Sequence, residues 1–305
     1  MEGIYDVIIL GGGPGGYTAA LYTTRAGLST LVLEKLSIGG QMTQTAQIDN
    51  YPGFENGIDG FTLGMKMQAG AERFGAKTQI SEILSVDLKA EPKVIETDSG
   101  SYYAKTVIIA TGAEHKHLGI EHEELLIGRG VGYCAACDGM LYRNKTVCVV
   151  GGGNSAVGDA LLLSRICQKV YLIHRRDSLR ASKVTQEALL KAENVEIKWN
   201  SVPSELHYDK KLTGVQIRST KDNSTEEIPC DGLFISIGRA PSTQLFGGQL
   251  ELQNGYILAD ETTRTSLPGV FAVGDVRTKP VRQVVTAAAD GAVAAHFAEE
   301  YLAEK

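Results

Sequence analysis

Two glycine-rich loops, each set between a buried strand and a helix, constrain this chain most. The first lies in "YDVIILGGGPGGYTAALYTTRAGLSTLVLEK", where the apolar run Val7–Leu10 predicts a strand buried on both faces and Pro14 opens a helix. The pattern returns about 140 residues later, with Val147–Val150 as the strand, Gly151–Gly153 as the turn and Ala156–Cys167 as the helix. Two complete β-α-β units predict an α/β fold with two Rossmann-like dinucleotide-binding domains.

The end of the chain indicates that the second domain is inserted into the first. A strand in "LPGVFAVGDV" and a helical pattern from Arg282 to Leu302 have no counterpart in the second half. The simplest arrangement folds them back onto the first domain. We therefore expect residues 1–115 and 244–305 to form one domain and residues 116–243 the other. A domain joined by two short crossings can rotate about them as a hinge.

The first loop has the spacing Gly11-x-Gly13-x-x-Gly16, and Glu34 ends the following strand. The first glycine permits the tight turn, the second lets the backbone approach a pyrophosphate, and the third lets helix and strand pack closely. Glu34 stands where an acidic residue binds ribose hydroxyls. The complete strand, turn, helix, strand and acid favour a dinucleotide site over a structural turn alone.

The second loop has the spacing Gly151-x-Gly153-x-x-Ala156. After the second strand of this unit the sequence reads "HRRDSLR", at the place where the first unit has Glu34. Cations at this place match the 2′-phosphate of NADP, although a solvated basic run is the ordinary alternative. The residues concerned are His174, Arg175, Arg176 and Arg180. Late in the chain, Gly274–Asp275 follows a strand, and its carboxylate either binds flavin ribityl hydroxyls or caps a helix.

Cys134 and Cys137 are separated by two residues and followed at once by Asp138. A structural zinc needs four ligands, and no other ligand stands at metal spacing, so we expect no metal site. A permanent disulfide closing so short a loop would constrain little. A redox pair fits best, with Asp138 as a proton donor or acceptor beside the thiols. Cys148, Cys167 and Cys230 are interpreted as small buried apolar residues.

Composition limits the classes of partner and the cellular compartment that we expect for this protein. The formal charge of −6 argues against nucleic acid as a partner, and no apolar run reaches the length of a membrane span. The five cysteines have no framework spacing, and no secretory signal is visible at the N-terminus. These observations favour a reducing compartment and therefore the cytoplasm.

These motifs together resemble the bacterial low-molecular-weight thioredoxin reductases over essentially the whole chain. The resemblance is carried by "CAACDG", the two β-α-β units, "HRRDSLRASK" and "VFAVGDVRTKPVRQVVTAAADGAVAA". It implies a homodimeric flavoenzyme in which electrons pass from NADPH through FAD and a dithiol to thioredoxin. In this branch the dithiol lies in the NADPH domain, and that domain rotates during the cycle.

The resemblance also implies roles for individual residues. Cys137 corresponds to the sulfur next to the flavin, Cys134 to the nucleophile that attacks thioredoxin, and Asp138 to the acid. FAD would be held by Gly11, Gly13, Gly16, Glu34, Gly40, Gln41, Asn50, Asp275, Arg282 and Gln283. NADPH would be held by Gly153, Asn154, Ser155, His174, Arg175, Arg176 and Arg180.

The sequence departs from the family pattern at one place. The family usually reads "GGG[DN]SAVEEA", whereas this chain reads "GGGNSAVGDA", so Gly158 and Asp159 replace two glutamates. In the family this helix faces the nicotinamide end, so the change favours a relative that takes electrons from another donor such as reduced ferredoxin. Other functions on the same fold are a dithiol oxidase, a peroxiredoxin-reducing subunit and a flavin-bound scaffold.

Overall fold

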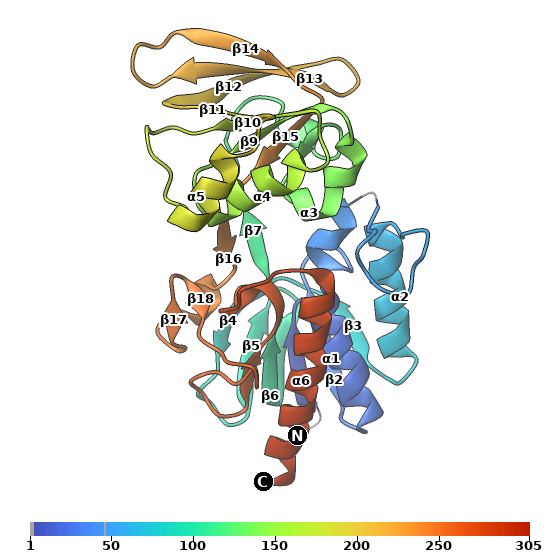
Figure 1. Cartoon of the computed structure of the whole chain (residues 1–305). Coiled ribbons are helices and arrows are strands. Elements are labelled where there is room, and N and C mark those ends of the chain that lie inside the picture. The colour runs from blue at the N-terminus through green and yellow to red at the C-terminus, as the bar shows by residue number, and fades with distance from the viewer. Residues whose placement is uncertain (1–2, 46) are drawn as a thin grey trace. The chain divides into compact units, whose positions relative to one another are not determined.

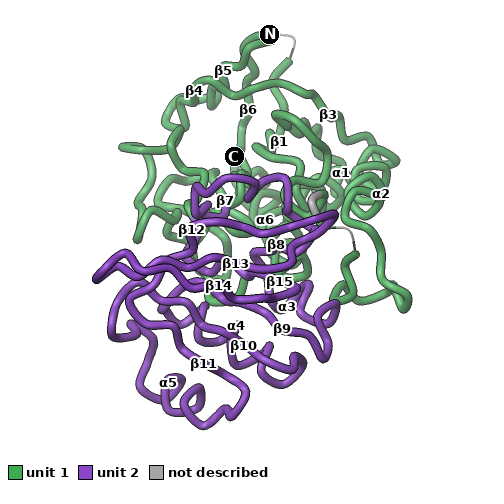
Figure 2. Tube along the Cα trace, turned by 90° about the horizontal axis from the view of Figure 1, so that it is seen from above, with its two compact units in different colours: residues 1–114, 240–305 green, residues 115–239 purple. Residues whose placement is uncertain are grey.

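The computed structural model describes residues 3–45 and 47–305. The chain divides into two compact units (Figure 2). The first comprises Met1–Glu114 and Ala240–Lys305, and the second comprises His115–Arg239. The predicted insertion spanned residues 116–243, whereas the chain re-enters the first unit four residues earlier, after Arg239. The assignment of a cofactor to each unit stays a prediction.

The first unit is built on a largely parallel sheet in the order β3-β2-β1-β6-β5-β4, with β19 pairing with the end of β6 (Figure 1). Its strands are β1 (Ile4–Leu10), β2 (Thr30–Glu34), β3 (Lys77–Ile80), β4 (Ile83–Asp87), β5 (Lys93–Thr97), β6 (Gly100–Ile109) and β19 (Val270–Ala272). Its helices are α1 (Pro14–Arg25), α2 (Gly60–Glu72) and α6 (Val284–Ala303). Short 3-10 turns are η1 (Gly40–Gln44), η4 (Gln244–Phe246) and η5 (Gly274–Val276), and β17 (Leu252–Gln253) pairs with β18 (Tyr256–Ile257).

Strand β1 is buried on both faces, as its apolar run predicted. Val7 and Ile9 pack in a core with residues of α1 and α6, whereas Ile8 and Leu10 pack in a second core on the other side of the sheet. Alternate side chains of a strand point to opposite faces, so a covered sheet needs apolar residues at every position. The glycine-rich loop therefore follows directly on a strand that is packed on both faces.

The second unit repeats the arrangement with a parallel sheet in the order β11-β10-β9-β15-β8. Its strands are β8 (Val131–Gly132), β9 (Thr146–Val150), β10 (Lys169–Ile173), β11 (Val195–Lys198) and β15 (Gly232–Ile235). An antiparallel sheet of β12 (Ser201–Tyr208), β13 (Leu212–Ser219) and β14 (Thr225–Pro229) completes the strands. Its helices are α3 (Ala135–Asp138), α4 (Asn154–Ser164) and α5 (Lys183–Leu190), with 3-10 turns η2 (Glu124–Leu126) and η3 (Gly139–Tyr142).

The two crossings pair with each other. Strand β7 (Ala113–His115) and strand β16 (Arg239–Pro241) form a two-stranded sheet of their own. The amide of Lys116 extends this pairing by donating to the carbonyl of Gly238 at 3.1 Å. The backbones of the two crossings are therefore paired by hydrogen bonds.

The three remaining cysteines are buried apolar residues, as predicted. Cys148 and Cys230 lie in one core of the second unit and Cys167 lies in the other. Burial raises the pKa of the Cys167 thiol to about 11, which keeps it protonated and unreactive. Within the described residues, no helix is long and apolar enough to cross a bilayer.

Candidate active site

The first glycine-rich loop has the geometry that its spacing predicted. Gly11 adopts a φ of +108°, in the region that favours glycine. A Cβ on Gly16 would collide with the carbonyl oxygen of Gly11, so only glycine lets α1 start this close to β1. A Cβ on Gly13 would meet no protein atom within 4 Å. The outer side of this loop is therefore open beside the first turn of α1, where free N–H groups attract a phosphate.

Several predicted residues of the first unit surround this loop. Glu34 ends β2, and its Oε2 accepts a hydrogen bond from the amide of Gly12 at 2.7 Å. Turn η1 packs against the loop, because a Cβ on Gly40 would lie 3.2 Å from the Cα of Gly13. The side-chain amide of Gln41 donates to the carbonyl of Ala113 at 2.5 Å. The structure thus brings the residues of β2 and η1 to one glycine loop.

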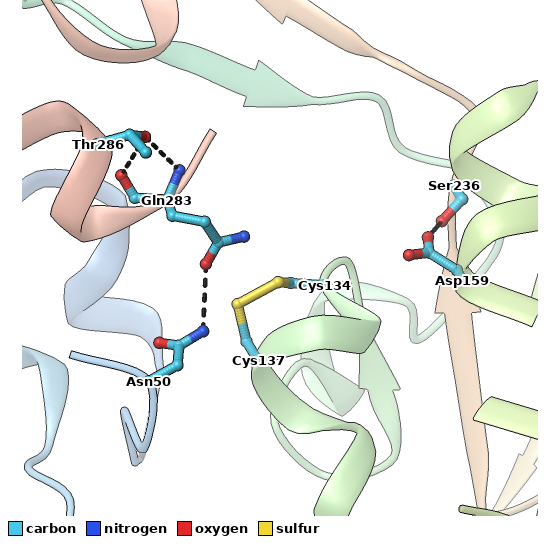
Figure 3. Close-up of a disulfide and its surroundings, with 7 residues drawn as sticks. All are labelled: Asn50, Cys134, Cys137, Asp159, Ser236, Gln283 and Thr286. Atoms are coloured by element: carbon cyan, nitrogen blue, oxygen red, sulfur yellow. Dashed lines mark hydrogen bonds between the residues drawn. A yellow bond between two sulfur atoms is a disulfide. The ribbon is translucent and has the colours of Figure 1, made fainter. Parts of the chain in front are cut away.

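The other predicted residues of this unit lie at the N-terminal end of α6, in contact with that end, or in the neighbouring turn η5. Asn50 donates to the side-chain oxygen of Gln283 at 3.1 Å, joining positions 233 apart in sequence (Figure 3). Gln283 also caps α6 through reciprocal hydrogen bonds with Thr286. Arg282 lies over the ring of Tyr256 at 4.2 Å, and Asp275 lies half-buried in η5. Asp275 is the first-turn acid of η5, which leaves the capping and the ribityl interpretations both open.

A buried ionic cluster fixes η5 against α6, and the sequence analysis missed it. Asp290 of α6 receives hydrogen bonds from Arg277 at 2.8 and 2.9 Å, from Lys279 at 2.7 Å and from the amide of Gly274 at 2.8 Å. Burial alone would raise the pKa of Asp290, but its hydrogen bonds to Arg277 and Lys279 outweigh burial and lower it. The signal in sequence is one carboxylate within the apolar run "TAAADGAVAA", sixteen residues after Gly274.

Asp290→Ala should lower the free energy of unfolding by about 3–5 kcal/mol, because it leaves two buried cations without their carboxylate. The lowered pKa means that the contribution of Asp290 is present above about pH 4 and is lost as the pH falls below that value. Urea denaturation at pH 7 and pH 3 measures both effects. Asp222→Ala, at an exposed turn, is the matched control and should cost far less.

The second glycine-rich loop repeats the geometry in the second unit. Gly153 caps α4, and a Cβ there would meet nothing within 4 Å, as at Gly13. Asn154 and Ser155 are exposed in the first turn of α4. The basic segment is tied back to this loop, because the amide of Arg180 donates to the carbonyl of Gly152 at 2.7 Å and that of Ser182 to Asn154 Oδ1 at 2.8 Å.

The four basic residues of this segment have two different surroundings. Arg175, Arg176 and Arg180 are exposed. His174 is only 5% exposed, and its ring occupies the space that a Cβ on Gly152 would need. Burial lowers the pKa of His174, so the ring is uncharged at neutral pH and its Nε2 donates to the carbonyl of Ser178 at 3.0 Å. The exposed arginines can therefore pair with an anion, whereas the buried ring of His174 packs against Gly152 of the glycine-rich loop.

Cys134 and Cys137 form a disulfide with their Cα atoms 5.2 Å apart (Figure 3). Cys134 caps α3, and its carbonyl accepts hydrogen bonds from the amides of Cys137 and Asp138, both at 3.1 Å. The pair thus lies on a single turn. In an exchange reaction, an attacking thiolate bonds to one sulfur of such a pair and displaces the other. The disulfide also agrees with the redox interpretation of the sequence over a zinc site.

Asp138 ends α3, and burial raises its pKa to about 6. Its carboxylate lies beside Gly132, where a Cβ would be 3.4 Å from Oδ2. A carboxyl group with a pKa near neutrality can both donate and accept a proton under working conditions. Asp138, the residue after Cys137, is therefore chemically suited to proton transfer.

The departure from the family pattern leaves α4 intact. Gly158 is exposed with open space around it, and the helix runs through it without a break. Asp159 accepts a hydrogen bond from the hydroxyl of Ser236, at the end of β15 (Figure 3). Burial raises the pKa of Asp159, and the bond from Ser236 partly offsets this. Asp159 is thus held at the carboxyl edge of the parallel sheet, where Rossmann folds bind their ligands.

Comparison with known proteins gives one consistent result. Residues 5–291 match the family described as pyridine nucleotide-disulphide oxidoreductase. The chain is 49% identical to a thioredoxin reductase of Listeria monocytogenes, covering 99% of this chain and 95% of that protein. The crystal structure of thioredoxin reductase from Streptococcus pyogenes superposes with a TM-score of 0.93 at 40% identity, with both chains fully covered. A ferredoxin-flavin thioredoxin reductase from Clostridium acetobutylicum gives a TM-score of 0.53 at 32% identity, covering 99% of each chain.

Proposed function

Because this chain belongs to the pyridine nucleotide-disulphide oxidoreductases, in the branch of the low-molecular-weight thioredoxin reductases, we propose that it reduces the disulfide of thioredoxin. Electrons would pass from NADPH through FAD and the Cys134–Cys137 pair to thioredoxin. The observation that carries this proposal is the disulfide on α3, which lies in the same unit as a complete dinucleotide loop and directly before it in sequence.

The first unit supplies the residues for FAD. The open space over Gly13 and the first turn of α1 fit a pyrophosphate, and the carboxylate of Glu34 at the end of β2 fits ribose hydroxyls. Gly11, Gly16, Gly40, Gln41, Asn50, Asp275, Arg282 and Gln283 complete the proposed set. When bound, FAD supplies a two-electron carrier between the nicotinamide and the disulfide.

The second unit supplies the residues for NADPH. Gly153, Asn154 and Ser155 open α4 and would face the pyrophosphate, as Gly13 does in the first unit. Arg175, Arg176 and Arg180 are exposed beside this loop, where guanidinium groups would pair with the 2′-phosphate. His174 would act by supporting Gly152. The retained arginines favour NADPH over ferredoxin as the electron donor.

The chemistry at the sulfurs is a thiol–disulfide exchange. The Cys134 thiolate attacks the disulfide of thioredoxin, forming a mixed disulfide and releasing one thioredoxin thiolate. Cys137 then attacks the Cys134 sulfur, which restores the Cys134–Cys137 disulfide and releases the second thioredoxin thiolate. Two electrons leave the enzyme. Asp138, which follows Cys137 in sequence and has a raised pKa, would supply or accept the proton at these sulfurs. The family resemblance supports a cytoplasmic homodimer as the working form.

A direct test uses the purified protein loaded with FAD. We expect it to oxidise NADPH when oxidised thioredoxin is supplied, with a small reporter disulfide as the final acceptor. Anaerobic stopped-flow with NADPH, NADH or reduced ferredoxin identifies the electron donor. Turnover with none of a panel of thioredoxins would refute the proposal, and reduction by ferredoxin alone would replace NADPH in it.

Arg175→Ala and Arg176→Ala should each raise KM for NADPH by about 10- to 100-fold, since each removes a charge-assisted hydrogen bond to the 2′-phosphate. KM for NADH should change little, because NADH lacks that phosphate. Arg165→Ala is the matched control, at the other end of α4. Equal losses with NADPH and NADH would contradict a phosphate site, as would an equal loss in the control.

A further inference from the structure

Tyr133, which directly precedes Cys134, is held by a cluster that the proposed reaction does not use. Its ring stacks on His115 with the ring centroids 4.8 Å apart, and His117 meets it edge-on at 5.5 Å. Its hydroxyl donates to Glu123 Oε1 at 2.8 Å, and His117 Nδ1 lies 2.9 Å from the same hydroxyl. The residue before the disulfide thus has ring contacts with two histidines and a hydrogen bond at its polar end.

Glu123 is the anchor of this cluster. Its side chain is only 2% exposed, and its two oxygens accept hydrogen bonds from the amides of Leu118 at 3.1 Å and Gly119 at 2.9 Å. His117 Nδ1 approaches the same carboxylate at 3.3 Å. Burial and the hydrogen bond to Glu123 raise the pKa of Tyr133, so its hydroxyl keeps its proton and remains a donor. One buried carboxylate therefore ties the chain leaving β7 to the chain entering the disulfide.

We infer that Tyr133 and Glu123 are positioning residues that hold Cys134 beside Cys137 when the pair is reduced. The inference rests on the proposed redox role of the pair. In the oxidised form the S–S bond itself fixes Cys134. In the dithiol form that bond is gone, and the contacts of the neighbouring residues decide how close the two thiols stay. Tyr133 supplies those contacts on the N-terminal side.

Loosening Cys134 has a predictable effect on the equilibrium between disulfide and dithiol. Less positioned thiols have a lower effective concentration toward each other, so closing the disulfide costs more conformational entropy. The equilibrium then shifts toward the dithiol. Dithiothreitol reduces the disulfide with one molecule of reagent for each enzyme molecule. The enzyme disulfide takes up two electrons and two protons as the reagent dithiol becomes its cyclic disulfide.

Tyr133→Phe keeps the ring contacts and removes the hydrogen bond to Glu123. We expect the equilibrium constant for reduction of the holoenzyme by dithiothreitol to rise about fivefold, the factor that corresponds to one typical net hydrogen bond. Acid quenching, alkylation and mass spectrometry of the peptide that holds Cys134 and Cys137 measure it. Tyr208→Phe is the matched control, because Tyr208 meets His122 edge-on at 4.9 Å in the same unit without preceding the disulfide.

Glu123→Gln tests the second positioning residue. Like Tyr133→Phe, it should shift the equilibrium between disulfide and dithiol toward the dithiol. A purely structural role would lower the melting temperature of both redox forms equally and leave the equilibrium constant unchanged, and that result would overturn the inference. So would an equal shift in Tyr208→Phe. If the disulfide of the unaltered protein cannot be cycled at all, the proposed function fails instead.

Discussion

A Cys137→Ser enzyme should reduce thioredoxin at least about 10³-fold more slowly than the unaltered enzyme. Serine cannot form the disulfide that accepts two electrons at α3, so no redox cycle can close. Cys134→Ser should lose the same activity. Steady-state oxidation of NADPH with thioredoxin measures both losses.

The two variants should differ in a trapping experiment, because the two sulfurs have different proposed roles. Thioredoxin with a single active-site cysteine, carried as a mixed disulfide with thionitrobenzoate, is the probe. In Cys137→Ser the thiol of Cys134 remains and should displace the coloured thionitrobenzoate, leaving a stable enzyme–thioredoxin disulfide. In Cys134→Ser the attacking thiol is gone, and no adduct should form.

Cys148→Ser is the control for both measurements. Cys148 is a fully buried thiol of β9 in the same unit, and its loss should leave turnover and trapping unchanged. A stable adduct with Cys134→Ser, and none with Cys137→Ser, would reverse the two roles. Turnover retained in either variant would exclude the dithiol mechanism.

Asp138→Asn should lower turnover with thioredoxin by about 10²- to 10⁴-fold, the usual contribution of a positioned general acid or base. Asparagine has nearly the same shape but cannot transfer a proton. Anaerobic reduction of the bound flavin by NADPH should stay close to that of the unaltered enzyme. Asp209→Asn, at an exposed position of the same unit, is the control.

The pH dependence gives this prediction a second readout. Burial raises the pKa of Asp138 to about 6, so the group holds its proton below that pH and loses it above. The rate of thiolate protonation should therefore fall as the pH rises through about 6, and this titration should be absent from Asp138→Asn. A variant within threefold of the unaltered rate, or one that keeps the titration, would assign proton transfer to another group.

The elements that could be predicted from sequence are those whose pattern is local. The glycine spacing, the buried strands β1 and β9 and the three buried cysteines each depend on neighbouring residues, and the structure agrees with them. Helix α4 was expected from Ala156 to Cys167 but runs from Asn154 to Ser164, since Gly153 caps it directly after the loop.

The contacts that local patterns could not reveal join distant positions. Asn50 and Gln283 lie 233 residues apart, and only the family resemblance named them together. Asp290 reads in sequence as an isolated polar residue of an apolar helix, because its cations precede it by eleven and thirteen positions in a loop. His174 reads as one more cation of a basic run, and only its burial distinguishes it from the arginines.

The inserted arrangement also sets the order in which the chain can fold during synthesis. The second unit is continuous, so it can complete its core as soon as Arg239 has left the ribosome. The first unit cannot, because β19 pairs with β6 and α6 packs on α1, and both arrive in the last 36 residues. Until α6 is made, the side of α1 that packs on it stays uncovered, although β1, β2 and α2 already contact the same helix.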